Sequence, residues 1–147
     1  MKKRKLEYSL AELIDKLTIN QIKINKKKKN NNSVKSEINQ ISNDIEIIIR
    51  KKKIKLDVNT IRAIIIISQI NLNIWNNKDI MESNVKNRKI YLKNLKIAHQ
   101  LNGVRNQIKN YLMQVEKKNK KINLMTNIKT DNLKLELNFK HNAKRKK

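Results

Sequence analysis

The chain has 147 residues, of which 38% are apolar, a size and composition typical of one domain with a modest core. It has no cysteine, which excludes disulfide frameworks, thiolate nucleophiles and sulfur-ligated metals. The absence of proline and the single glycine, Gly103, disfavour folds of many strands, because their turns draw on both residues.

The formal net charge of +24 would ordinarily indicate nucleic acid or another anionic surface as a partner. Part of this charge is explained by composition. Lysine, asparagine and isoleucine occur 30, 24 and 24 times, and their codons are the richest in A and T. Arginine, the side chain preferred for phosphate and base contacts, occurs only six times. We therefore expect that many surface lysines are compositional background.

The basic lead of residues 1–8 has the charge of a signal-peptide start. Glu7, Glu12 and Asp15 interrupt the hydrophobic segment that such a peptide needs. We therefore expect a cytoplasmic protein.

A helix is predicted from Ser9 onward. Ser9 and Glu12 form a capping box, in which the serine hydroxyl accepts a backbone N–H and the glutamate accepts the serine N–H. Positions at three- and four-residue steps then form an apolar stripe: Leu10, Leu13, Ile14, Leu17, Gln21 and Ile24. Lys26 to Lys29 suit the C-terminal end of this helix, and Asn30 to Asn32 are expected to form a loop.

A second helix is predicted with Ser33 as its N-cap. Its apolar positions alternate like a heptad: Val34, Ile38, Ile41, Ile45 and Ile48. Such a stripe packs against another helix, and we expect it to be a dimer seam. Arg50 to Lys53 interrupt the pattern and Asp57 to Thr60 offer caps for a restart, so one helix and two helices both remain open for residues 33–82.

The stretch from Ile61 to Trp75 is the most apolar of the chain and is predicted to be a helix at the centre of the core. One side of this helix holds Ile61, Ile64, Ile65, Leu72 and Trp75, and the adjoining side holds Ile67, Ile70 and Ile74. This apolar arc is wide, so we expect neighbouring helices on more than one flank. A buried strand is disfavoured because the helical spacing continues beyond strand length. A membrane span is disfavoured because polar residues interrupt a run that is already short: Arg62, Gln69, Asn71 and Asn73.

The polar segment from Asn76 to Asn87 is predicted to be the turn of a helical hairpin. A regular stripe then indicates a further helix: Leu92, Leu95, Ala98, Leu101, Val104, Ile108, Leu112 and Val115. Gly103 inside it costs roughly 1 kcal/mol relative to alanine, and it would allow close approach of a neighbouring helix. Lys117 to Lys121 are expected to end the element.

The fold class predicted from these patterns is all-α, an antiparallel helical hairpin or small coiled-coil-like bundle of about three helices over residues 9–118. Residues 119–147 are expected to be a poorly ordered basic tail. Within it, apolar residues alternate with polar ones at period two, from Leu133 to Phe139. We interpret this segment as an extension that can add to the sheet edge of a partner.

The stretch from Ser9 to Lys23 resembles the opening of a family of small bacterial helical proteins without an established activity. That family begins Ser-Val-Gly-Glu-Leu-Ile-Asp-Lys-Ile-Thr-Ile-Leu-Glu-Ile-Lys, where this chain has Ser-Leu-Ala-Glu-Leu-Ile-Asp-Lys-Leu-Thr-Ile-Asn-Gln-Ile-Lys. Later counterparts extend the resemblance over most of residues 9 to 115: Ile74-Trp75 with Asp79, and Asn102, Arg105, Ile108 and Lys109.

The chain departs from the family pattern at Ala11, where a glycine is usual, at Gln21 for a glutamate and at Gly103 for an aspartate. Residues 76–78 also lack an acid that the family places next to the tryptophan. If those acids carried a function, part of it is lost in this chain. The resemblance implies an all-helical, coiled-coil-like architecture and adds no mechanism.

No catalytic constellation is evident, and we expect no enzymatic activity, cofactor, metal or small-molecule substrate. The two histidines, His99 and His141, lie far apart in sequence, and phosphate-loop, metal-ligand and nucleophile motifs are missing. The best polar candidates for a site are on two helices: Glu12, Asp15, Lys16 and Lys23 with Asn102, Arg105 and Lys109. They fit either an ionic pair that sets helix register, Asp15 or Glu12 with Arg105 or Lys109, or a shared partner-binding pocket.

The function predicted from the sequence is that of a non-enzymatic interaction or scaffold protein, which binds a protein partner or itself through helical seams. The alternative is a nucleic-acid-binding accessory protein, associated with RNA or the ribosome. Its phosphate contacts would be Lys26, Lys27, Lys28, Lys29, Arg50, Lys51, Lys52 and Lys53, with Lys117 to Lys121.

Overall fold

The computed structural model describes residues 8–26 and 31–117, and every element in these two segments is an α-helix. The helices are α1 (Leu10–Lys26), α2 (Asn32–Lys52), α3 (Val58–Ser83) and α4 (Arg88–Lys117). The predicted all-α class is confirmed. The described residues hold four helices where about three were expected, and residues 33–82, for which one helix and two helices were both open, form two. The predicted tail of residues 119–147, with its alternating segment, lies outside the described residues.

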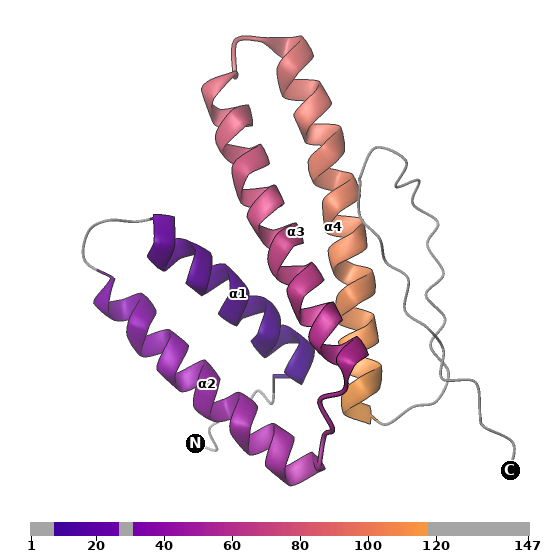
Figure 1. Ribbon diagram of the computed structural model, residues 1–147. Helices are drawn as coiled ribbons and strands as arrows, with labels where there is room; N and C mark the ends of the chain where they lie inside the picture. The colour runs from indigo at the N-terminus through magenta and orange to yellow at the C-terminus, as the bar shows by residue number, and fades with distance from the viewer. Residues whose placement is uncertain (1–7, 27–30, 118–147) are drawn as a thin grey trace, which may run out of the picture.

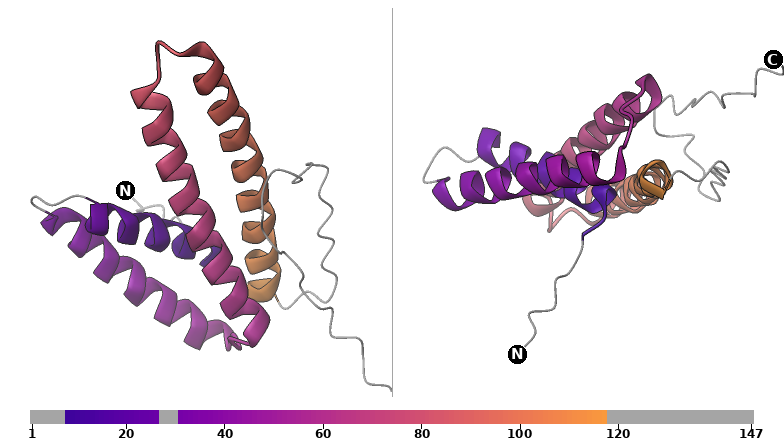
Figure 2. Two further views of the ribbon diagram at one scale, coloured as in Figure 1. Left: turned by 45° about the horizontal axis from the view of Figure 1, so that its top comes forward. Right: turned by 90° about the horizontal axis from the view of Figure 1, so that it is seen from below.

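The four helices form two antiparallel pairs that splay apart in a V (Figure 1). In one pair α1 lies along α2, and in the other α3 lies along α4. The shortest helix, α1, packs on all three others, so it joins the pairs. At 1.5 Å per residue the 30 residues of α4 span about 45 Å and the 17 residues of α1 about 26 Å. The α3–α4 pair therefore extends well beyond α1 (Figure 2).

The start of α1 is the predicted capping box. The Ser9 hydroxyl accepts the Glu12 N–H at 3.2 Å, and the Glu12 carboxylate accepts the Ser9 N–H at 3.2 Å. The expectation for α2 is wrong by two residues: its N-cap is Asn31, and Ser33 lies in the first turn. An asparagine is as good a cap as a serine, and the run of asparagines before Ser33 hid which residue begins the helix.

The break between α2 and α3 depends on two residues. Lys53 has a left-handed backbone (φ 49°, ψ 48°), and its N–H bonds the Arg50 carbonyl at 3.3 Å, which closes α2. Asp57 begins α3 by accepting the Thr60 N–H at 2.8 Å. This hydrogen bond, together with the Thr60 hydroxyl, lowers the pKa of Asp57. Of the two alternatives that the sequence left open, the structure has the restart at Asp57.

The core lies where the first half of α3 and the second half of α4 meet α1. Its fully buried side chains come from three helices, and the largest are Leu10, Ile67, Ile70, Leu101, Ile108 and Leu112. The α2 stripe packs against this core from the side of α1: Ile41 is buried, and Ile45, Ile48 and Ile49 are partly buried. The stripe predicted as a dimer seam is therefore largely used inside the chain.

The two apolar sides of α3 differ in burial. Ile61, Ile65 and Leu72 are 48%, 52% and 41% exposed, and Trp75 is half-buried. The side predicted as adjoining, with Ile67 and Ile70, is fully buried. Both sides are rich in isoleucine, so the sequence pattern has a broad apolar arc and leaves the centre of that arc undetermined.

The hairpin turn is shorter than predicted, because α3 continues through Asn76 to Ser83 and only residues 84–87 connect it to α4. Two buried asparagines hold this distal part. Asn77 Nδ2 donates to the Asn94 carbonyl at 2.5 Å, and Asn94 Nδ2 donates to the Ile90 carbonyl at 2.9 Å.

Within the described segments no helix is both long and apolar enough to cross a membrane.

Candidate functional site

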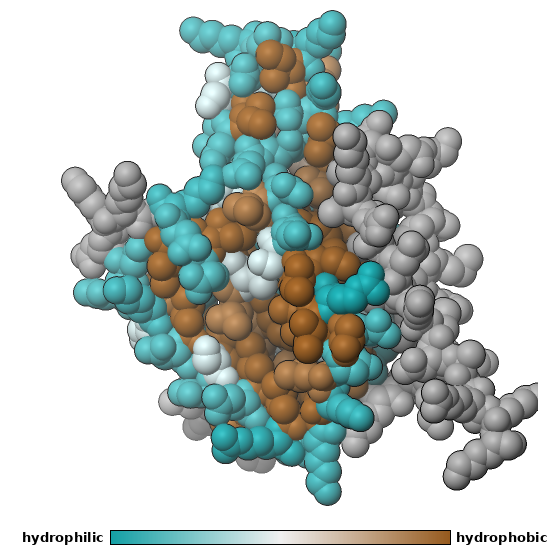
Figure 3. Space-filling view, viewed as in Figure 1, coloured by the Kyte–Doolittle hydropathy of each residue, from teal (hydrophilic) through white to brown (hydrophobic). Residues whose placement is uncertain are grey.

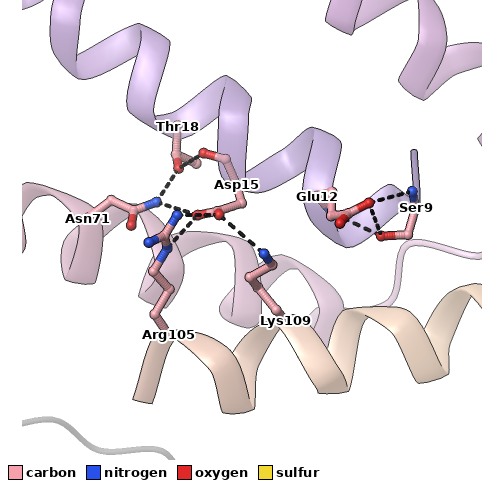
Figure 4. A network of polar contacts seen from close by, with 7 residues as sticks. All are labelled: Ser9, Glu12, Asp15, Thr18, Asn71, Arg105 and Lys109. Carbon is pink, nitrogen blue, oxygen red and sulfur yellow. Dashed lines mark hydrogen bonds and ion pairs between the residues drawn. The ribbon is translucent and has the colours of Figure 1, made fainter. Parts of the chain in front are cut away.

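A buried cluster of polar side chains joins α1, α3 and α4 around Asp15 (Figure 4). Asp15 Oδ1 accepts from Arg105 Nε at 2.9 Å, and Oδ2 accepts from Arg105 Nη2 at 2.5 Å, so the pair is bidentate. Lys109 Nζ lies 3.6 Å from Oδ2. The Asp15 side chain is 5% exposed and the two cations are each 26% exposed, so the cluster is closed toward α1 and partly open along α4.

Two polar residues complete the cluster from the side of α3. Asn71 Nδ2 donates to Asp15 Oδ1 at 2.9 Å and to the Thr18 hydroxyl at 2.7 Å. Thr18 in turn donates to the Asp15 backbone carbonyl at 2.8 Å. Asp15 thus has both oxygens occupied and its carbonyl bonded, which is the condition under which a buried carboxylate is tolerated.

The electrostatics of the cluster favour ionised Asp15. Burial by itself raises the pKa of this carboxyl, but hydrogen bonds from Arg105 and Asn71 and the charges of Arg105 and Lys109 lower it more. The pKa of Asp15 therefore lies below its ordinary value of 3.8. At neutral pH the cluster carries two cations on one carboxylate.

Of the seven predicted site residues, the structure brings together Asp15, Arg105 and Lys109. Glu12 belongs to the capping box and points away from the cluster, toward Ser9 (Figure 4). The other three do not join the cluster through any contact the structure gives: Lys16 lies over the Tyr8 ring at 4.0 Å, Asn102 is exposed on α4, and Lys23 is half-buried near the end of α1. The ionic pairing expected of Asp15 is present, with both of the predicted partners.

Asn71 was missed as a cluster residue although the sequence held a signal for it. It stands inside the most apolar stretch of the chain, where a polar side chain on a helix needs a partner once it is buried. Asn71 is 5% exposed, and its neighbours across the helix interface are Asp15 and Thr18.

A second buried acid, Glu116, was also missed. Its Oε2 accepts the Leu10 N–H at 2.7 Å, so a side chain of α4 caps the first turn of α1. Its Oε1 pairs with Lys52 at the end of α2. Glu116 therefore ties the start of α1 to the ends of α2 and α4.

Among the described cations proposed for phosphate contacts, Lys26 lies at the end of α1, whereas Arg50 to Lys53 lie together at the end of α2. Lys26 donates to Asn76 at 2.6 Å and lies 3.6 Å from Asp79, so it braces α1 on α3. Lys27 to Lys29 lie outside the described residues. Arg50 pairs with Glu46 at 3.4 Å, Lys52 pairs with Glu116, and Lys51 and Lys53 are exposed. Lys117 is exposed, and residues 118–121 lie outside the described part of the chain.

An apolar strip is left open along α3. We define the α3 stripe as Ile61, Ile65 and Leu72, which share one side of the helix at steps of four and seven residues and are all more than 40% exposed. Trp75 follows Leu72 by three residues and is therefore its neighbour on the helix surface. On the face shown in Figure 3, apolar side chains gather over α2 and α3. The described helices leave this side of α3 uncovered.

Comparisons with known proteins return no matching family model, no significantly similar curated protein and no significantly similar solved structure. The resemblance of residues 9 to 115 to a family of small bacterial helical proteins stays a prediction. Within residues 8–26 and 31–117, no three acidic or histidine side chains are grouped closely enough to hold a metal ion.

Proposed function

We propose that the protein is a non-enzymatic helical interaction protein that binds a helix of a protein partner along the α3 stripe. The observation that carries this proposal is the exposure of Ile61, Ile65 and Leu72 at 48%, 52% and 41% in one row. Rows of large aliphatic side chains at helical spacing are the surfaces into which an amphipathic helix packs. The row is continuous with Trp75, a side chain enriched in binding hot spots.

The partner that fits best is an acidic amphipathic helix. The chain carries a net charge of +24, so an acidic ligand is attracted and a basic one is repelled. The same charge opposes pairing of two copies of this chain through the stripe. The partner helix would place leucine-like residues on the stripe, and its acids would be attracted by the net positive charge of the chain.

In this proposal the Asp15 cluster is a scaffold and not a reaction centre. Its carboxylate has its hydrogen-bonding positions filled by Arg105 and Asn71, and Lys109 balances it further. A carboxylate so engaged is a poor base. The cluster fixes how α1, α3 and α4 meet, and so fixes the side of α3 that stays open.

A titration of Trp75 fluorescence tests the proposal, since this is the only tryptophan. The probe is a synthetic amphipathic peptide with leucines on one face and glutamates on the other. We expect saturable binding with a change in Trp75 emission. We expect no binding of a peptide with the same residues in scrambled order.

The variant Ile65→Asp should abolish the signal while the circular dichroism of the protein is retained. Val85→Asp, at a residue 68% exposed in the α3–α4 turn, is the matched control and should bind normally. Equal loss in both variants, or binding of the scrambled peptide, would contradict the proposal. So would a dimer in sedimentation velocity that Ile65→Asp converts to a monomer, because the stripe would then be a seam between two copies.

A further inference from the structure

Three segments far apart in sequence meet at one end of the molecule. Glu116 near the end of α4 accepts the N–H of Leu10 at the start of α1 at 2.7 Å and pairs with Lys52 at the end of α2. The connection from α2 to α3 leaves from the same place (Figure 1). We call this region the basic end, because basic residues converge on it.

The described cations of the basic end come from the end of α2, the connection to α3 and the end of α4: Arg50, Lys51, Lys52, Lys53, Lys55 and Lys117. The acids nearby are already engaged. Glu116 holds Lys52, Glu46 pairs with Arg50, and Asp57 caps α3.

The opposite end of the α3–α4 pair carries Lys86 in its turn and Arg88 and Lys89 at the start of α4, with Glu82 exposed and Asp79 paired with Lys26. The convergence at the basic end follows from the tertiary contacts of Glu116, which bring its separate runs together.

Two aliphatic side chains stand exposed among these lysines. Leu56 is 45% exposed and Val58 is 71% exposed, on either side of Asp57, whose carboxylate is turned to the Thr60 N–H. Lysines bind phosphate groups. Exposed aliphatic side chains contribute favourable binding free energy only where binding removes them from water. Nucleic acid phosphates would use the lysines and leave Leu56 and Val58 in solvent. A bilayer surface accepts both, with lysines at the headgroups and aliphatic side chains at the boundary with the acyl chains.

We propose that the basic end docks peripherally on an anionic membrane surface, with Lys51, Lys53 and Lys55 at the lipid phosphates and Leu56 and Val58 inserted shallowly. The charge complementarity and the exposed aliphatic pair carry this inference. Val58 precedes Ile65 by seven residues and so lies on the same side of α3 as the α3 stripe. Lys51 and Lys55 lie outside the stripe, so substitutions at these two lysines separate vesicle docking from peptide binding.

The test is flotation of the full, nuclease-treated chain with vesicles. The probe vesicles contain phosphatidylcholine mixed with phosphatidylglycerol, and the comparison vesicles contain phosphatidylcholine alone. We expect binding only to the anionic vesicles, weakened by salt. Lys51→Ala with Lys55→Ala should lower the affinity by about fivefold per lysine, because a cation near an anionic surface is worth about that factor.

The pair Leu56→Ser with Val58→Ser distinguishes a bilayer from other polyanions. We expect it to weaken vesicle binding while the circular dichroism and the net charge stay the same. The controls at the opposite end, Lys86→Ala with Lys89→Ala and Val85→Ser, should bind vesicles like the original chain. The proposal is overturned if the serine pair binds as well as the original, if the two ends respond alike, or if duplex RNA binds more tightly than the vesicles and displaces the protein from them.

Discussion

Asp15 is the residue on which the arrangement of three helices depends. Its carboxylate is buried, accepts a bidentate pair from Arg105 on α4 and a further hydrogen bond from Asn71 on α3. Such a pair adds little over a well-packed apolar contact, but removing one partner leaves an uncompensated charge and is costly. The value of the cluster is therefore in specifying one way for the helices to meet.

Replacement of Asp15 by asparagine should destabilise the fold. The side chain keeps its size, but Arg105 and Lys109 lose their counter-charge. Because both cations are 26% exposed and can be partly solvated, we expect a loss of about 2 kcal/mol in the free energy of unfolding, less than the loss for a fully buried pair. Urea denaturation measures it. Asp79→Asn is the control. Asp79 pairs with Lys26 at 3.6 Å and its side chain is 55% exposed, so this variant should lower the free energy of unfolding by under about 1 kcal/mol.

The penalty of Asp15→Asn should depend on pH. The folded pKa of Asp15 is lowered, so ionisation contributes stability above the unfolded pKa, and this contribution is lost as the pH falls through the folded pKa. The difference between the two proteins should therefore be constant near neutral pH and narrow once the pH drops below 3.8. A difference that stays constant down to acid unfolding would show that the carboxylate charge does not stabilise the fold.

At the scale of the helices, the capping residues predicted helix starts, whereas the apolar periodicity did not predict which side of α3 is buried. The capping box at Ser9 and the restart at Asp57 were visible because a cap involves only neighbouring residues. The inward side of α3 was not, because isoleucines nearly surround the helix and only the neighbours decide which of them are buried. Asp15, Arg105 and Lys109 could be proposed from residue type, and Asn71 had a signal as a polar residue inside the most apolar stretch, whereas the role of Glu116 could be found only from tertiary contacts.

Paired alanine substitutions on α3 test which side is inside. Ile67 is fully buried, so Ile67→Ala should cost about 2–5 kcal/mol through lost burial and a cavity. Ile65 is 52% exposed, and Ile65→Ala should cost under about 1 kcal/mol. Urea unfolding of the two variants measures the order. The reverse order would contradict the burial of Ile67 and the exposure of Ile65.

At the scale of the whole molecule, the lysine-rich composition and the topology have separate effects. The composition raises the net charge to +24 but does not determine where on the surface the cations lie. The contacts of Glu116 bring the end of α2, the start of α1 and the end of α4 together at one end of the molecule. The α3 stripe likewise arises from topology, because α1 and α4 cover one side of α3 and leave the other open. The interaction surfaces of this protein are therefore determined by how the two helix pairs are joined.

The most direct test of the proposed function uses the absence of cysteine. Single cysteines are placed at Ile65 in the α3 stripe and at Ile47, which is 59% exposed on α2, and their alkylation rates are measured with and without the saturating acidic amphipathic peptide. We predict that both cysteines react readily in the free protein and that the peptide slows the reaction at position 65 several-fold while position 47 is unaffected. Unchanged alkylation at position 65 with bound peptide, or slow alkylation there in the free protein, would contradict the assignment of the α3 stripe as the binding surface.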